Sequence, residues 1–183
     1  MDNGASSYRR FLDGDQSGFD ELIDMYREPL VYFINGFLGD IEESEDVAEE
    51  AFMELIVHPH RFSFRSSFKT YLFSIARNKA VDRVRKFKKI SPTPIDDIDI
   101  EDIERIEKEI FKAENAQILR DAMKKINPEY ATLLRLIYFE DMTSEEAGKV
   151  LKKSKRQIAN LTYRAKNSLR RAMEEEGFSY EES

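Results

Sequence analysis

The stretch from His58 to Lys89 combines positive charge with aromatic rings. It contains ten Lys or Arg residues and a single acid, Asp82, in a chain whose formal net charge is −7. Lys and Arg bind phosphates and release counterions whatever the net charge of the whole protein. Phe and Tyr rings can stack on bases that have left a duplex. The stretch therefore predicts contact with a nucleic acid, and Phe62 and Phe64, which precede the expected helix, are candidates for that contact.

A second basic segment lies near the C-terminus. From Lys149 to Arg171 there are nine Lys or Arg residues and no acid. Thr143 followed by Glu146, and Ser154 followed by Gln157, each have the form of a helix-capping box. They predict a short helix, a turn of about three residues and a longer helix, which is the form of a helix-turn-helix. Together with the charge, this pattern favours binding in the major groove over a packed structural hairpin.

An acidic segment precedes the first basic stretch. From Asp40 to Glu54 there are eight acids and no base, and Asp40 followed by Glu43 predicts the N-cap of a helix. Two interpretations stay open from the residues alone. One is a solvated face whose acids favour the N-terminal end of the helix dipole. The other is a docking surface for a basic partner, with Phe52 as its apolar anchor.

Helical spacing of apolar residues dominates the rest of the chain. Residues 19–38 predict a helix that Pro29 kinks or splits. Ser66 or Ser67 is expected to cap a helix that continues to about Lys89, and Asn127 with Pro128 predicts another helix start. Between Asp96 and Glu114, nine acids face three bases. We therefore expect an all-α fold of two small helical domains, residues 1–89 and 113–183, joined by an acidic linker at 90–112.

Composition excludes several classes of site. The chain has no Cys, which removes disulfides, thiolate zinc sites and Cys nucleophiles. It has two His, at positions 58 and 60, without further ligands of matching type nearby, so we expect no metal and no cofactor. No apolar run is long enough to span a bilayer, and the N-terminus lacks the apolar core of a signal peptide. We expect a cytoplasmic protein that is not membrane-embedded.

The combined pattern resembles the extracytoplasmic-function (ECF) sigma factors, the short sigma factors that have only the second and fourth sigma domains. The resemblance covers about Tyr8 to Met173, except for the linker. The segments that carry it are GDQSGFDELIDMYREPL, EDVAEEAF, FRSSFKTYLFSIARNKAVD, YFEDMTSEEAGKVL and TYRAKNSLRRAM.

The resemblance implies a promoter-specificity subunit without catalytic activity or a small-molecule substrate. Its partners would be core RNA polymerase, promoter DNA and, in many members, an anti-sigma factor. It implies a polymerase-binding surface at Asp46, Glu49, Glu50 and Phe52. It implies minus-ten DNA contacts, with capture of a flipped base by the loop, at Arg61, Phe62, Phe64, Arg65, Ser66, Ser67, Phe68, Tyr71, Arg77, Asn78, Lys79 and Arg83. It implies minus-thirty-five contacts at Ser154, Lys155, Arg156, Gln157, Asn160, Tyr163 and Arg164.

The sequence departs from the family at several positions. Lys152 and Lys153 occupy the turn where Gly and an apolar residue are usual, Ala159 and Leu161 replace residues that are often basic, and Tyr71 replaces a common Trp. Two other functions can be compared with this one. A stand-alone helix-turn-helix regulator would need neither the acidic helix nor the aromatic loop. A nuclease would need a pair of carboxylates at a metal-binding spacing, and the sequence has no recognisable one.

Overall fold

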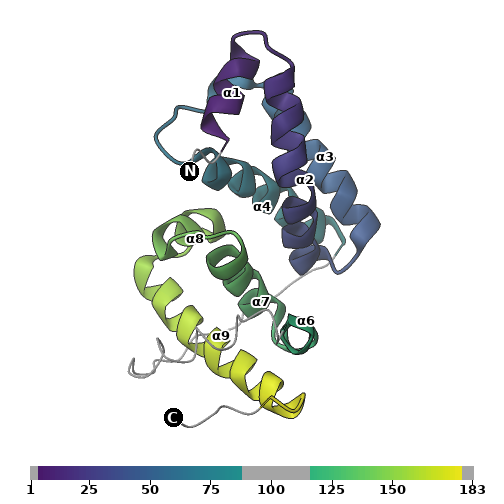
Figure 1. Ribbon diagram of the computed structural model, residues 1–183, viewed down its shortest axis with the longest axis vertical. Helices are drawn as coiled ribbons and strands as arrows, with labels where there is room; N and C mark the ends of the chain where they lie inside the picture. The colour runs from purple at the N-terminus through teal and green to yellow at the C-terminus, as the bar shows by residue number, and fades with distance from the viewer. Residues whose placement is uncertain (1–3, 88–115, 179–183) are drawn as a thin grey trace. The chain divides into compact units, whose positions relative to one another are not determined.

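Helices make up every regular element in the part of the chain that the computed structural model describes, residues 4–87 and 116–178 (Figure 1). These residues fall into two compact units. The all-α class and the two helical domains expected from the sequence are confirmed.

The first unit contains α1 to α4. The helices are α1 (Ala5–Leu12), α2 (Ser17–Leu38), α3 (Ile41–Val57) and α4 (Phe68–Phe87), with a 3-10 turn, η1 (Pro59–Arg61), after α3. The unit also includes α8 (Ser144–Leu151). The second unit contains α6 (Ala116–Lys125), α7 (Pro128–Leu134), the short π-helical segment η3 (Arg135–Phe139) and α9 (Lys155–Glu175).

Helix α2 is the centre of the first unit, where it packs against α1, α3 and α4 (Figure 1). Side chains from these helices that have little or no exposed surface form the core: Tyr8, Leu22, Leu30, Phe33, Ile34, Val47, Ala51, Leu55, Phe68, Leu72, Phe73 and Ala76. Burial of this many large apolar side chains supplies the main driving force for folding.

Pro29 does not split α2, which runs through it as one helix. A proline leaves the carbonyl four residues earlier without its helical partner, here that of Met25. Met25 is 45% exposed, so this side of the helix faces solvent. Tyr26 and Leu30 are buried on the other side, and their packing holds the helix together across the proline.

The predicted helix starts are confirmed where a side chain caps the backbone. Asp40 accepts a hydrogen bond from the Glu43 N–H at 3.1 Å, and Asn127 accepts one from the Glu129 N–H at 2.8 Å. Ser67 accepts one from the Thr70 N–H at 3.2 Å, which identifies it, rather than Ser66, as the cap of α4. Such bonds satisfy backbone donors that the first helical turn leaves without partners.

Helix α1 was not anticipated from the sequence. It lies so close to α2 that a Cβ on Gly18 would stand 2.3 Å from the Ser7 carbonyl oxygen. Glycine therefore permits a contact between the two backbones that any other residue would block.

The second unit has its own core. Leu119, Ala122, Met123 and Ile126 of the α6 region pack with Leu134 of α7 and with the α9 side chains Ala165, Leu169, Ala172 and Met173. This core holds α9 against α6 and α7, so that its other faces are available for contacts outside the unit.

Candidate interface for nucleic acid and a basic partner

The acidic side of α3 is exposed. Asp46, Glu49 and Glu50 lie in solvent, whereas Val47, Ala48 and Ala51 are buried against the core. Phe52 is 6% exposed and meets Phe19 edge to face, with ring centroids 6.2 Å apart. The structure thus places Phe52 in the core, and its predicted role as a surface anchor is not supported by its position.

Other apolar side chains of α3 lie beside the acids. Met53 is 53% and Val57 60% exposed, large fractions for such residues. A groove of about 450 Å³ runs along this surface, lined by Asp46, Glu49, Glu50, Met53, Glu54, Val57 and Lys79. Sequence reasoning missed Met53 and Val57, because only the helix's orientation against α2 and α4 decides which apolar positions stay exposed.

Ion pairs join the acidic helix to cations of the basic stretch. Arg83 of α4 binds both Glu43 and Glu50. Glu54 contacts Arg61 at 2.6 Å and Lys79 at 3.6 Å. Three of the cations assigned to minus-ten DNA are therefore paired with acids of α3, and one of these acids, Glu50, was assigned to polymerase binding.

The loop between α3 and α4 is an aromatic cluster. Phe62 is 5% exposed and stacks on Tyr71, with centroids 4.9 Å apart and planes at 25°. Phe68 is fully buried. Phe62 and Phe68 are therefore core residues that shape the loop. Phe64 is half-buried, and Arg61, Arg65 and Ser66 are exposed.

Helix α4 presents the remaining residues assigned to minus-ten DNA. Arg77, Asn78 and Lys79 are partly exposed along it, and Ala76 and Ala80 are buried. The Nε of Arg77 is buried and has no hydrogen-bond partner, and burial lowers the pKa of this guanidinium. Burial also raises the pKa of Tyr71, with the Glu54 carboxylate as a further cause.

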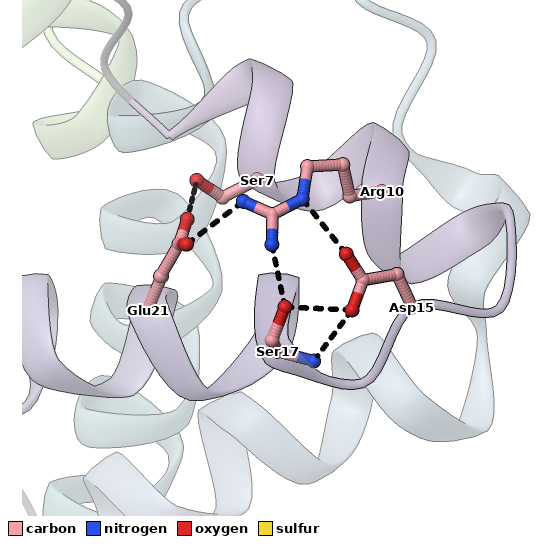
Figure 2. Close-up of polar contacts among 5 residues, drawn as sticks. All are labelled: Ser7, Arg10, Asp15, Ser17 and Glu21. Atoms are coloured by element: carbon pink, nitrogen blue, oxygen red, sulfur yellow. Dashed lines mark hydrogen bonds and ion pairs between the residues drawn. The ribbon is translucent and has the colours of Figure 1, made fainter.

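A polar network fixes α1 to the start of α2. Figure 2 shows the Arg10 guanidinium donating to Asp15 at 2.9 Å, to Glu21 at 2.8 Å and to Ser17 at 2.5 Å. Ser7 also donates to Glu21, at 2.8 Å. Hydrogen bonds from Ser17 and Arg10 lower the pKa of Asp15. The network lies between α1 and α2, where it sets the position of α1.

The helix order of the C-terminal motif agrees with the sequence prediction. Residues 152–154 connect α8 to α9, and Lys152 has a φ of 55°, the left-handed conformation in which glycine is usual. The Ser154–Gln157 capping box is complete: the Gln157 N–H donates to the Ser154 hydroxyl and the Ser154 N–H to the Gln157 side chain. Gln157 is therefore committed to the cap.

Helix α9 separates buried from exposed positions as the spacing predicts. Ile158, Leu161 and Ala165 are buried, whereas Ser154, Lys155, Arg156 and Gln157 are exposed and Asn160, Tyr163 and Arg164 partly exposed. Tyr163 and Arg164 border a groove of about 590 Å³. The groove is lined by Lys125, Ile126, Tyr130, Tyr163, Arg164, Asn167, Ser168, Arg171, Ala172 and Glu175. The sequence did not indicate this groove, since its wall comes from α6 and α7.

Residues 4–87 and 116–178 contain no cluster of three or more His, Asp or Glu side chains suited to a metal ion. No helix in the same ranges has the length and apolar character needed to cross a membrane.

Family models match both halves of the chain. Residues 22–90 match Sigma-70 region 2, and residues 116–169 match Sigma-70, region 4. Similar curated proteins include the ECF RNA polymerase sigma factor SigW of Bacillus subtilis, 25% identical over 173 residues, covering 87% of this chain and 91% of SigW. SigM of the same species is 27% identical over 151 residues, covering 82% of this chain and 92% of SigM.

Solved structures with a similar fold include CnrH in complex with the cytosolic domain of CnrY. The TM-score is 0.60 at 20% identity, and the likeness covers 94% of this chain and 96% of that one. The sigma factor RpoE of Bartonella quintana, in complex with the anti-sigma factor NepR, gives a TM-score of 0.60 at 18% identity, covering 85% of this chain and 96% of that one.

Proposed function

The chain belongs to the sigma-70 family, as an ECF sigma factor with regions 2 and 4, and we propose how its residues divide the work of promoter recognition. Members of this family are DNA-binding initiation factors rather than classical enzymes. They direct core RNA polymerase to promoters. The observation that carries the residue assignment is the separation of exposed charge in the first unit, with acids on α3 and cations on the loop and α4.

The exposed side of α3 binds the polymerase in this proposal. Asp46, Glu49 and Glu50 supply negative charge for a basic surface, and Met53 and Val57 supply the apolar contact that the buried Phe52 does not. A site with apolar area inside a charged rim suits stable binding better than charge alone.

The loop and α4 bind the minus-ten element and its displaced strand. Arg61, Phe64, Arg65 and Ser66 stand at the loop surface, and Arg77, Asn78, Lys79 and Arg83 continue along α4. Phe62, Phe68 and Tyr71 support the loop from inside. Cations attract the phosphates of the strand, and a ring holds a base that has left the stack.

Helix α9 binds the minus-thirty-five element. Ser154, Lys155, Arg156, Asn160, Tyr163 and Arg164 supply phosphate and base contacts, while Gln157 serves the capping box instead. For the domain boundaries we keep the sequence-based proposal: region 2 in residues 1–89, an acidic linker at 90–112 and region 4 in residues 113–183, with α8 counted in region 4 although its contacts group it with the first unit. The linker lies entirely outside the described residues. The protein acts in the cytoplasm, where RNA polymerase works.

An anti-sigma factor is a further partner in this proposal. The RpoE structure of similar fold was solved with one, NepR. The groove beside α9, with its Lys and Arg side chains and its two Tyr rings, and the groove on α3 are surfaces that such a protein would cover.

The test uses purified protein with core polymerase and a library of random promoter sequences. Wild-type protein should give promoter-dependent transcripts that core alone does not. Glu49→Lys should lose core binding and these transcripts, whereas Asp20→Lys, an equal charge change at an exposed position of α2, should retain both. Core binding without promoter selectivity would contradict the proposal. Tight binding of duplex DNA by the isolated protein, unaffected by polymerase, would instead indicate a stand-alone helix-turn-helix regulator.

A further inference from the structure

Arg9 of α1 contacts the ring of Phe64 in the loop. Its guanidinium carbon lies 4.7 Å from the ring centroid, and the Arg9 side chain is exposed. Its neighbour Arg10 is held by two carboxylates and a hydroxyl (Figure 2). By contrast, none of the acids in residues 4–87 and 116–178 forms an ion pair with Arg9. Arg10 thus has a structural role, whereas Arg9 retains a charge that a phosphate or base can use.

Phe64 is held in a conformation that its side chain disfavours. Its φ is 57°, in the left-handed region, which is a true outlier for a bulky residue. Such strain persists where the surrounding structure enforces it, and it gathers at ligand sites. The strained backbone brings the Phe64 ring to within 4.5 Å of the Phe62 centroid, and Phe62 in turn stacks on Tyr71. A row of three rings therefore ends at the half-buried Phe64.

The position of Arg9 relative to this row is fixed through Tyr8. The Tyr8 hydroxyl donates to the Pro59 carbonyl at 2.8 Å, and its ring contacts Phe62 and Phe68 at centroid distances of 5.8 and 4.9 Å. Tyr8 has no exposed surface. Tyr8 thus holds α1 against the loop and the first residue of α4 through three contacts. These contacts place the next residue, Arg9, beside Phe64.

We propose that Arg9 and Phe64 form a two-sided stacking site for one unpaired base, with the base held between the guanidinium plane and the ring. A base inserted between the guanidinium and the ring makes van der Waals contact on both of its faces, which requires about 7 Å between the two groups. The exposed Arg9 side chain can swing outward by the few ångströms that separate this from the present contact. Both flat groups stack well on bases of any sequence.

The charges around the site suit a single strand of nucleic acid. Arg65 is exposed on the same loop and can hold a phosphate next to a captured base, whereas Arg61 is exposed but paired with Glu54 at 2.6 Å and would have to leave that carboxylate to do the same. Arg9 lies outside residues 22–90, the part of the chain that matches Sigma-70 region 2. The site therefore adds a contact from α1 to the loop, and it rests on the proposed function.

The test uses the holoenzyme and a promoter recovered from the random library. Nucleotides of the non-template strand in the minus-ten region are replaced one at a time by an abasic residue, and the affinity for each DNA is compared with that for the intact promoter. Wild type should show a position where base removal weakens binding most. Arg9→Gln should weaken binding of intact promoter about 3- to 30-fold. It should also reduce the penalty of base removal at that position.

Two further variants separate stacking from charge. Arg27→Gln removes one charge from an exposed site of the same unit, where Arg27 lies 3.6 Å from Glu45, and should leave the abasic penalty as in wild type. Arg9→Lys keeps the charge but loses the flat guanidinium, and should behave like Arg9→Gln. Unchanged thermal unfolding of the Arg9 variants would show that the exposed substitution leaves the fold intact.

The outcomes of the two tests are distinct. An unchanged abasic penalty in Arg9→Gln, or a wild-type penalty in Arg9→Lys, would overturn the stacking site while leaving the proposed function in place. Wild-type holoenzyme that gave no promoter-dependent transcripts would instead contradict the proposed function itself.

Discussion

Phe64 is the residue at which stability and function should oppose each other. A left-handed backbone costs a non-glycine residue about 1–2 kcal/mol, and glycine adopts it freely. Phe64→Gly removes this strain but also loses ring contacts with Phe62, so we expect a change in the free energy of unfolding within about 1 kcal/mol. The same variant should lose most promoter opening by the holoenzyme. Urea unfolding and a permanganate footprint of melted DNA measure the two effects, and opening at the wild-type level would contradict the role of the ring.

Tyr8 should make the protein sensitive to alkaline pH. Burial raises its pKa from 10.0 to about 12. The folded state therefore keeps the proton over a range in which the unfolded chain has lost it. The stability that this contributes is complete below pH 10 and is lost as pH rises from 10 to 12.

Tyr8→Phe tests this assignment. Loss of the hydrogen bond to Pro59 should cost about 1 kcal/mol at neutral pH. Between pH 10 and 12 the variant should lose about 2–3 kcal/mol less than wild type, because one pKa unit is worth about 1.4 kcal/mol. Tyr138, whose pKa burial also raises to about 12, is present in both proteins and cancels in the difference. Parallel stability curves above pH 10 would show that Tyr8 titrates normally.

At the scale of elements, cations of α4 can pair either with carboxylates of α3 or with the phosphates of DNA. Glu43 holds Arg83, which is also assigned to DNA, so the carboxylate and a phosphate compete for the same guanidinium. Glu43→Gln should raise the affinity of the holoenzyme for promoter DNA about 2- to 5-fold, the worth of a surface ion pair. Glu42→Gln makes an equal charge change on the same helix and should raise the affinity for promoter DNA by a smaller factor.

Arg83→Ala provides the control for this competition. In that background the two Gln variants should bind promoter DNA equally, because the guanidinium for which Glu43 competes is gone. A difference that persisted would mean that Glu43 acts through general electrostatics or through the fold of α3.

The elements that sequence predicted well are those fixed by local contacts. Asp40, Asn127 and Ser154 cap their helices through hydrogen bonds that span only two or three residues, so spacing alone identified them. Helix α1 was missed because its eight residues offer little periodic signal and owe their position to Tyr8 and to the Arg10 network. Isolated helices this short are unstable, and tertiary packing decides whether they form.

The candidate sites were predicted by residue type but not by exposure. Charge located the acidic and basic surfaces, since charged side chains rarely enter a core. The exposure of aromatic and apolar residues was harder to predict, because an aromatic ring on a helix or loop can pack in a core or contact a ligand equally well. Phe52 and Phe62 proved to be buried, while Met53 stayed exposed. Only the packing of α2, α3 and α4 distinguishes these cases.

Over the whole molecule, opposite charges alternate along the chain. The acidic segment from Asp96 to Glu114 lies between two segments of high positive charge, and it falls outside the described residues. A polyanionic segment tethered beside cationic surfaces competes with DNA at a high effective concentration. We therefore expect this segment to suppress non-specific DNA binding by the free protein.

Amide replacements test this suppression. Asn or Gln replaces Asp96, Asp97, Asp99, Glu101 and Asp102, and the control variant carries the same five charge changes at exposed acids of the first unit, Asp13, Asp20, Asp24, Glu28 and Glu42. The linker variant should bind random duplex DNA about 10-fold more tightly than the control at low salt, with the gap closing as salt screens the charges. Equal affinities would show that net charge alone sets non-specific binding and that the segment does not shield the DNA-binding surfaces.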